Sequence, residues 1–178
     1  MKPEHYLTLW KYYEFVERRY AKTEQYVAHR EINENTISIE FAQQIMIICS
    51  EVEVVFKALC KALGNEHAGS IGDYKECILE NYPQIPQLEV KAPTISCTPW
   101  EDWKQKNKRL GWWGVYALLK HDRQANFMKA NWITTHQAMA GYYSILMVLR
   151  NHLDDLTNVQ KDYLRFDCKS SYFYGIRL

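Results

Sequence analysis

The stretch "SIEFAQQIMIICSEVEVVFKALCKALG", from Ser38 to Gly64, constrains the fold of this chain more than any other. Its large apolar side chains recur at steps of three and four residues, which is the spacing of one face of an α-helix. Ser38 is suited to cap such a helix at its start, and Gly64 is suited to end it. A helix of about 26 residues is roughly 39 Å long at 1.5 Å per residue. The stretch therefore predicts the central helix of a helical bundle.

Three further segments show helical spacing of their apolar residues, and they cover residues 5–29, 72–81 and 112–121. Another long helix is expected after Asn126, which is suited to cap it, with an apolar stripe that continues to Leu149. The 178 residues include only 7 Gly and 5 Pro, too few for the frequent turns of a β-sandwich or β-barrel. The expected fold class is all-α: an antiparallel helical bundle of four to five helices, forming one domain over residues 1–178.

Two segments outside these helices have a different character. The proline-rich stretch "PQIPQLEVKAPTISC" (residues 83–97) contains three prolines, so we expect a surface crossover or an extended arm there. After it, Thr98 and Glu101 have the spacing of a capping box, which predicts a new helix. The aromatic C-terminal tail "SYFYGIRL" is expected to pack as an extended strap, because an exposed aromatic end would promote aggregation.

Several classes of protein are not expected. No apolar run approaches the roughly 18 residues of a membrane span, and the N-terminus lacks a signal pattern, so we expect a cytoplasmic protein without a membrane partner. The 5 cysteines include no CxxC pair, which predicts free thiols, no metal site and no cofactor. The sequence has no glycine-rich phosphate loop, HExxH, GxSxG or Rossmann motif. Its net charge of +1 argues against a dedicated binder of duplex DNA.

Basic side chains are concentrated between Trp100 and Asn131, where seven basic and three acidic residues give a net charge of +4. Cations attract phosphates and aromatic faces stack on unpaired bases, so this region is a candidate for local, salt-sensitive contact with nucleic acid. The alternative is a solvated loop beside tryptophans that belong to the core. The candidate nucleic-acid-binding residues are Lys104, Lys106, Lys108, Arg109 and Trp112.

The stretch "KHDR", residues 120–123, is the strongest candidate for chemistry. His121 can act as a general acid or base near neutral pH, and Lys120 and Arg123 can hold a phosphate. The same cations at the end of a helix also complement the helix dipole. A third interpretation is an ion-pair node between two packed helices, for which the candidates are Glu51, Glu53 and Lys57.

Two blocks of the chain, "SIEFAQQIMIICSEVEVVFKALC" and "WWGVYALLKHDRQANFMKANWITTHQAMAGYYSIL", together resemble uncharacterised bacterial proteins of the HEPN type (higher eukaryotes and prokaryotes nucleotide-binding). The resemblance covers roughly Ser38 to Leu149 without the proline-rich stretch. It implies an all-α bundle, often a homodimer, in a superfamily that includes metal-independent ribonucleases of toxin–antitoxin, phage-defence and RNA-processing systems. The active site of those ribonucleases has the pattern RxxxxH, usually with Asn or another polar residue directly after the Arg.

Carried onto this chain, the motif places its histidine at His121, its arginine position at Tyr116 and the following polar position at Ala117. The last two depart from the nuclease pattern, and a tyrosine donates a hydrogen bond without carrying a permanent charge. We therefore expect a non-catalytic or degenerate HEPN-like domain that binds RNA, a nucleotide or a protein partner in a bacterial defence or toxin–antitoxin context. The alternative is a metal-independent ribonuclease in which His121 is the acid or base, supported by Lys120, Arg123 and Tyr116.

Overall fold

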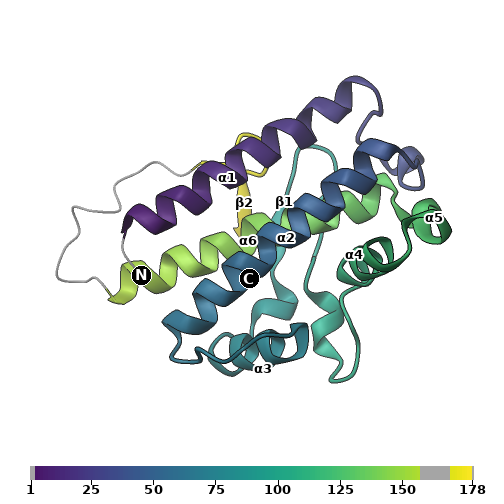
Figure 1. Cartoon of the computed structure of the whole chain (residues 1–178). Coiled ribbons are helices and arrows are strands. Elements are labelled where there is room, and N and C mark those ends of the chain that lie inside the picture. The colour runs from purple at the N-terminus through teal and green to yellow at the C-terminus, as the bar shows by residue number, and fades with distance from the viewer. Residues whose placement is uncertain (1–2, 157–168, 178) are drawn as a thin grey trace.

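The computed structural model describes residues 3–156 and 169–177, and it is predominantly helical, as the sequence predicts (Figure 1). The long helices are α1 (Pro3–Lys22), α2 (Ile39–Ala62) and α6 (Trp132–Leu156), and the shorter ones are α3 (Ile71–Asn81), α4 (Gly111–His121) and α5 (Arg123–Asn126). Short 3-10 turns are η1 (Thr23–Gln25), η2 (Glu31–Asn33), η3 (Ile85–Gln87), η4 (Glu101–Lys104) and η5 (Phe127–Lys129). Strands β1 (Glu89–Lys91) and β2 (Gly175–Arg177) pair in an antiparallel sheet. None of the described helices combines the length and hydropathy that crossing a lipid bilayer requires.

Helix α2 has the limits and the buried face that the sequence predicts. Ser38 Oγ accepts a hydrogen bond from Phe41 N at 2.9 Å at the start of the helix. Just beyond its end, Gly64 has a φ of +90°, a left-handed conformation that glycine adopts without strain. The apolar face is completely buried, and it includes Ile45, Ile48, Cys49, Val52, Val55, Phe56 and Leu59.

Helices α2 and α6 run in the same direction, whereas α1 runs opposite to both (Figure 1). At the start of α6, Trp132 N donates a hydrogen bond to Thr36 O, just before α2, at 2.9 Å. Near the other end, His152 Nε2 lies 3.4 Å from Ala62 O, the last residue of α2. The expectation that all helices are antiparallel is therefore wrong for this pair. Between α2 and α6 the chain passes through α3, the proline-rich stretch and α4, which return it to the end of the molecule where α2 begins.

The proline-rich stretch is a packed crossover. Leu88 and Val90 are buried, and Val90 exchanges backbone hydrogen bonds with Cys97 at 2.8 and 3.0 Å. Strand β1 also pairs with β2 of the C-terminal tail, with Val90 opposite Ile176. Tyr172 is buried as well, so over residues 169–177 the tail packs on the chain as an extended strap. The segment between Leu156 and Lys169 lies outside the described residues.

Three expected helix boundaries differ from the structure. Helix α1 ends at Lys22 instead of near residue 29. Helix α6 begins at Trp132, because Asn131 Oδ1 accepts a hydrogen bond from Thr134 N at 3.0 Å, while Asn126 ends α5. The hydroxyl of Thr98 donates to the carboxylate of Glu101 at 3.3 Å and caps no backbone N–H, so the residues after it form only the 3-10 turn η4. Polar turns between the helices therefore extend further than the apolar spacing indicates.

The core around α4 is a cluster of indole rings. Trp100 lies 4.9 Å from Trp103 and 5.5 Å from Trp112, measured between ring centroids. Trp112 Nε1 donates to Pro99 O and Trp100 Nε1 donates to Ser144 Oγ, both at 2.8 Å, so these buried donors have partners. The cluster packs α4 and η4 against α6.

Gly141 of α6 allows this close packing, and its replacement should show it. A Cβ added at Gly141 would lie 3.0 Å from Trp112 Cζ2, and this indole is only 2% exposed. Overpacking costs about 1–3 kcal/mol, and the better helix propensity of alanine offsets about 1 kcal/mol of it. We expect Gly141→Ala to lower the free energy of unfolding by about 1 kcal/mol in urea denaturation.

Gly114→Ala in α4 is the matched control, because no described atom lies within 4 Å of its added Cβ. This variant should be neutral or more stable by up to about 1 kcal/mol. Equal unfolding free energies for the two variants would contradict the contact between Gly141 and Trp112.

Candidate functional site

The stretch "KHDR" forms the end of α4 and the junction with α5. Helix α4 stops because Asp122 adopts an extended backbone conformation (φ −146°, ψ 90°), and its Oδ1 then accepts a hydrogen bond from Ala125 N at 3.0 Å to cap α5. Lys120, His121 and Arg123 are all exposed. The junction therefore presents three basic side chains to solvent.

His121 stands apart from the groups that a ribonuclease needs beside it. Within residues 3–156 and 169–177, no hydrogen bond or ion pair involves the His121 side chain. Lys120 Nζ lies 5.8 Å from the centroid of the Tyr116 ring, within the range of a cation–π contact. Cleavage of RNA requires a group that stabilises the charge developing on the phosphate, held where it meets the acid or base. The described part of the chain holds no such group in contact with His121.

Tyr116, at the arginine position of the nuclease motif, belongs mainly to the aromatic core. Its side chain is only 7% exposed, and its ring lies edge-on to Trp113 with centroids 5.3 Å apart. Tyr116 and His121 therefore do not share an open surface. In the ribonuclease alternative, charge stabilisation would fall to the exposed Lys120 and Arg123.

Four basic residues lie from the last residue of η4 to the start of α4, and two of them are paired with acids. Lys104 Nζ lies 3.2 Å from Glu101 Oε1, and Lys108 Nζ lies 2.8 Å from Asp102 Oδ1. Asp102 Oδ2 also accepts a hydrogen bond from Gly111 N at 2.8 Å, so it holds the start of α4 as well. The charges of Lys104 and Lys108 are thus partly neutralised by neighbours on the same loop.

The other two basic residues of this loop, Lys106 and Arg109, are exposed, and no ion pair among the described residues involves them. The loop itself is tied to α3, because Lys75 Nζ donates to the carbonyl oxygens of Gln105 and Lys106 at 2.7 and 3.0 Å. Two unpaired cations therefore lie on a loop whose backbone is held in place.

Trp112 does not offer a stacking face for nucleic acid, so the prediction is wrong for this residue. Its side chain is 2% exposed and its ring packs between α6 and the other indoles. The alternative interpretation, in which the tryptophans belong to the core, describes Trp112 correctly. The physical reason is that a large apolar ring gains more by burial against α6 than it gains at the surface.

Two of the three predicted ion-pair residues, Glu53 and Lys57, pair with each other within α2. Lys57 Nζ is 2.8 Å from Glu53 Oε1, four residues earlier. Glu51 is half-buried, and this burial raises the pKa of its carboxyl group. No ion pair in the described part of the chain joins "KHDR" to Glu51 or Glu53. The exposed cations at the end of α4 are thus not engaged in a node with α2.

Arg123 lies instead beside an open groove of about 510 Å³, between the start of α2 and the α5–η5 turn. The groove is largely apolar, with Ile39, Ala42 and Phe127 among its lining residues. Gln43 and Gln124 add amide groups that can donate and accept hydrogen bonds. A guanidinium group beside an apolar groove suits a ligand that combines a phosphate with a planar base.

Sequence reasoning missed a pair of completely buried histidines, His29 and His136. His29 Nδ1 lies 2.7 Å from Tyr172 OH in the tail, and His136 Nδ1 lies 2.8 Å from Tyr20 OH in α1. Burial lowers the pKa of each imidazole to about 4, so both are neutral at pH 7. Because neither ring reaches solvent, the pair is structural: it joins α1, α6 and the tail.

Only one of these histidines had a signal in the sequence. His136 lies in the apolar stripe after Asn126, where a polar ring needs buried partners, whereas His29 lies at the end of the first predicted helix, directly before a polar stretch. Among the described residues, no group of three or more His, Cys, Asp or Glu side chains could hold a metal ion.

Comparison of the chain with protein-family models, with curated proteins and with solved structures gave no match. The structure itself is predominantly helical, and exposed basic residues lie near both ends of α4. The chemistry of those residues, rather than a relative, must therefore support a function.

Proposed function

We propose that this chain is a non-catalytic, HEPN-like helical domain that binds single-stranded RNA through exposed cations at the two ends of α4. The observation that carries the proposal is that four basic side chains near the two ends of α4 are exposed and outside every ion pair of the described residues: Lys106, Arg109, Lys120 and Arg123. Cations that are already paired with acids gain less from a phosphate than unpaired ones.

The distance between the two groups of cations favours a strand over a mononucleotide. Helix α4 has 11 residues, so its two ends are about 16 Å apart at 1.5 Å per residue. A ligand that contacts both groups needs several phosphates along an extended backbone. The groove beside Arg123, with Phe127 in its wall, supplies an apolar surface for an unpaired base.

The same geometry supports a binding role over catalysis. No ion pair of the described residues involves His121, and Tyr116 is buried at the position where the HEPN nuclease motif has its arginine. The resemblance to HEPN proteins adds a homodimer and a role in bacterial defence or a toxin–antitoxin pair to the proposal. Two copies of the basic surface in such a dimer would double the number of phosphate contacts.

Charge reversal at α4 tests the proposal. We expect Lys120→Glu with Arg123→Glu to weaken binding of a fluorescently labelled single-stranded RNA at least tenfold in anisotropy titrations. Each lost phosphate contact should reduce the slope of log Kd against log salt concentration by about 0.7. Lys106→Glu with Arg109→Glu should have a similar effect, because both ends of α4 contact the strand.

The matched control is Lys11→Glu with Arg18→Glu, which changes the net charge equally on the exposed face of α1. This variant should bind RNA with nearly the wild-type affinity. Equal weakening by the α1 and α4 variants would mean that binding follows the net charge alone, and it would contradict a site at α4. Failure of the wild-type protein to bind RNA would reject the proposed function.

A further inference from the structure

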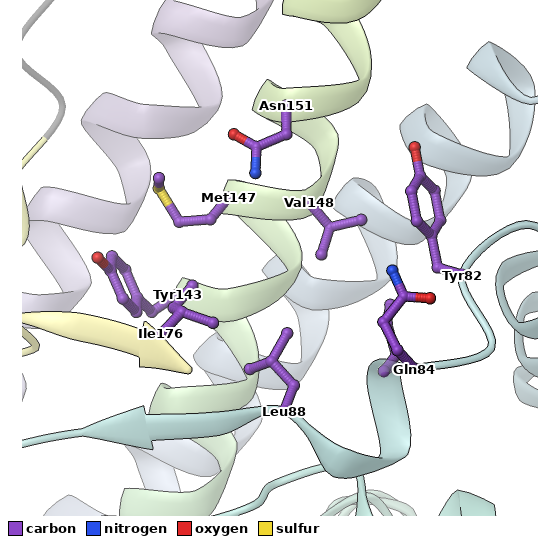
Figure 2. A pocket seen from close by; sticks show the side chains of 9 residues that line it. Tyr82, Gln84, Leu88, Tyr143, Met147, Val148, Asn151 and Ile176 are labelled. Carbon is purple, nitrogen blue, oxygen red and sulfur yellow. The ribbon is translucent and has the colours of Figure 1, made fainter. Parts of the chain in front are cut away.

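A second pocket, separate from α4, lies between α6, η3 and β2 (Figure 2). Its volume is about 430 Å³, within the range of roughly 300–1,000 Å³ that is usual for small-molecule sites. Apolar side chains form most of its wall: Ile85, Leu88, Met147, Val148 and Ile176. None of the residues proposed to bind RNA lines it.

Two amide side chains reach the pocket from different elements. Figure 2 shows Asn151 on α6 and Gln84, just before η3, with Val148 between them. Both residues are exposed, so they lie where a ligand enters. Each amide offers donors and an acceptor. Together they can bind a ligand edge that carries a donor beside an acceptor.

Aromatic groups and sulfur form two further parts of the wall. The hydroxyl of Tyr82 lies 2.8 Å from His152 Nδ1, which fixes the position of its ring. On the other side, Tyr143 and Met147 project from successive turns of α6. Aromatic rings and thioethers both make favourable contacts with aromatic ligands.

The charge of the lining is equally informative. The nine described lining residues include no Asp, Glu, Lys, Arg or His. A charged ligand would lose its hydration without gaining an opposite charge, which is unfavourable. The pocket therefore suits a neutral ligand.

The C-terminal tail completes the pocket. Ile176 of β2 is part of the wall, and the ring of Tyr143 stacks on Phe173 with centroids 5.6 Å apart and planes at 16°. The pairing of β2 with β1 places Ile176 opposite Val90, so this wall is held by main-chain contacts. A preformed wall lowers the cost of ordering the site when a ligand binds.

We propose that this pocket binds a small, neutral, planar ligand with an amide-like hydrogen-bonding edge, the chemistry shared by aromatic carboxamides and free nucleobases. The apolar and aromatic walls cover the ring of the ligand, and Asn151 and Gln84 bind its edge. The site is independent of the RNA-binding surface.

A titration of the full chain by two-dimensional ¹H–¹⁵N NMR tests the proposal. The probes are benzamide and adenine, which distinguish the two sources of the chemistry, with benzoate and benzylamine as charged analogues of benzamide. At least one neutral probe should shift pocket resonances saturably, and both charged analogues should bind at least tenfold more weakly. Shifts outside the pocket, equal binding of the charged analogues, or no saturable binding of either neutral probe would overturn the proposal.

Variants show which side chains carry the binding. Val148→Phe should fill the pocket and abolish binding, and Asn151→Leu, at an exposed position, should weaken it at least tenfold without loss of folding. The control Val54→Phe adds the same bulk on the exposed face of α2 and should leave the affinity unchanged. Lys120→Glu with Arg123→Glu should also bind the probe normally, which separates this site from RNA binding. Wild-type affinity in both pocket variants would overturn the assignment.

Discussion

Glu17→Leu should destabilise the protein by about 3–5 kcal/mol, a larger loss than that expected for Gly141→Ala. Glu17 of α1 is only 2% exposed, and its carboxyl group accepts hydrogen bonds from the tail. Ser171 donates to Oε2 from its backbone N at 2.9 Å and from its hydroxyl at 2.7 Å, and Tyr13 and Ser170 donate to Oε1. Leucine accepts no hydrogen bond, so these donors would be left without a partner.

Urea denaturation measures this loss, and limited proteolysis should remove the tail faster from Glu17→Leu than from the wild type. Glu4→Leu, an exposed change on the same helix, is the control and should cost less than about 0.5 kcal/mol. If the two variants unfold at the same urea concentration, α1 does not hold the tail through Glu17.

The second large effect is a loss of stability in mild acid. Burial lowers the pKa of His29 and His136 from 6.5 to about 4, so between these pH values the unfolded chain binds protons that the native chain does not. Stability is therefore complete above pH 6.5 and falls as the pH decreases towards 4, by up to about 1.4 kcal/mol per pH unit for each histidine. The phenols next to the pair, Tyr20 and Tyr172, have raised pKa values and stay neutral throughout this range.

Urea denaturation at a series of pH values measures the slope. His136→Gln should reduce the dependence of the unfolding free energy on pH by about half between pH 6.5 and 4, because one of the two buried imidazoles is removed. His67→Gln, at an exposed position, should leave the dependence unchanged. An unaltered slope in His136→Gln would show that its imidazole is not held neutral by burial.

The parts of the fold that follow from local patterns could be predicted from the sequence. Ser38 and Gly64 limit α2 through interactions within a few residues, and its apolar face is read directly from the spacing. The shared direction of α2 and α6 could not be predicted, because it depends on the path of the crossover between them. The buried position of Glu17 could not be predicted from the sequence either, since its hydrogen-bond partners, Ser170 and Ser171, lie more than 150 residues away in the chain.

For the candidate site, the solvent exposure of the basic side chains was easier to predict than their ion-pair partners. A basic stretch such as "KHDR" at a helix end faces solvent because four ionisable side chains cannot all be buried. The inward orientation of Trp112 depends on Gly141 of α6, which leaves room for the indole. The pairing of Lys108 with Asp102, six residues earlier, depends on the shape of the loop. Both are tertiary features that spacing along the sequence does not encode.

The most direct test of a binding rather than catalytic function is cleavage of end-labelled single-stranded RNA by the purified protein in chelator. We expect the wild type to bind the RNA and leave it intact, and His121→Ala to have the same melting temperature and no effect on the RNA. Cleavage by the wild type that is lost in an equally stable His121→Ala would contradict this account and make "KHDR" a metal-independent active site.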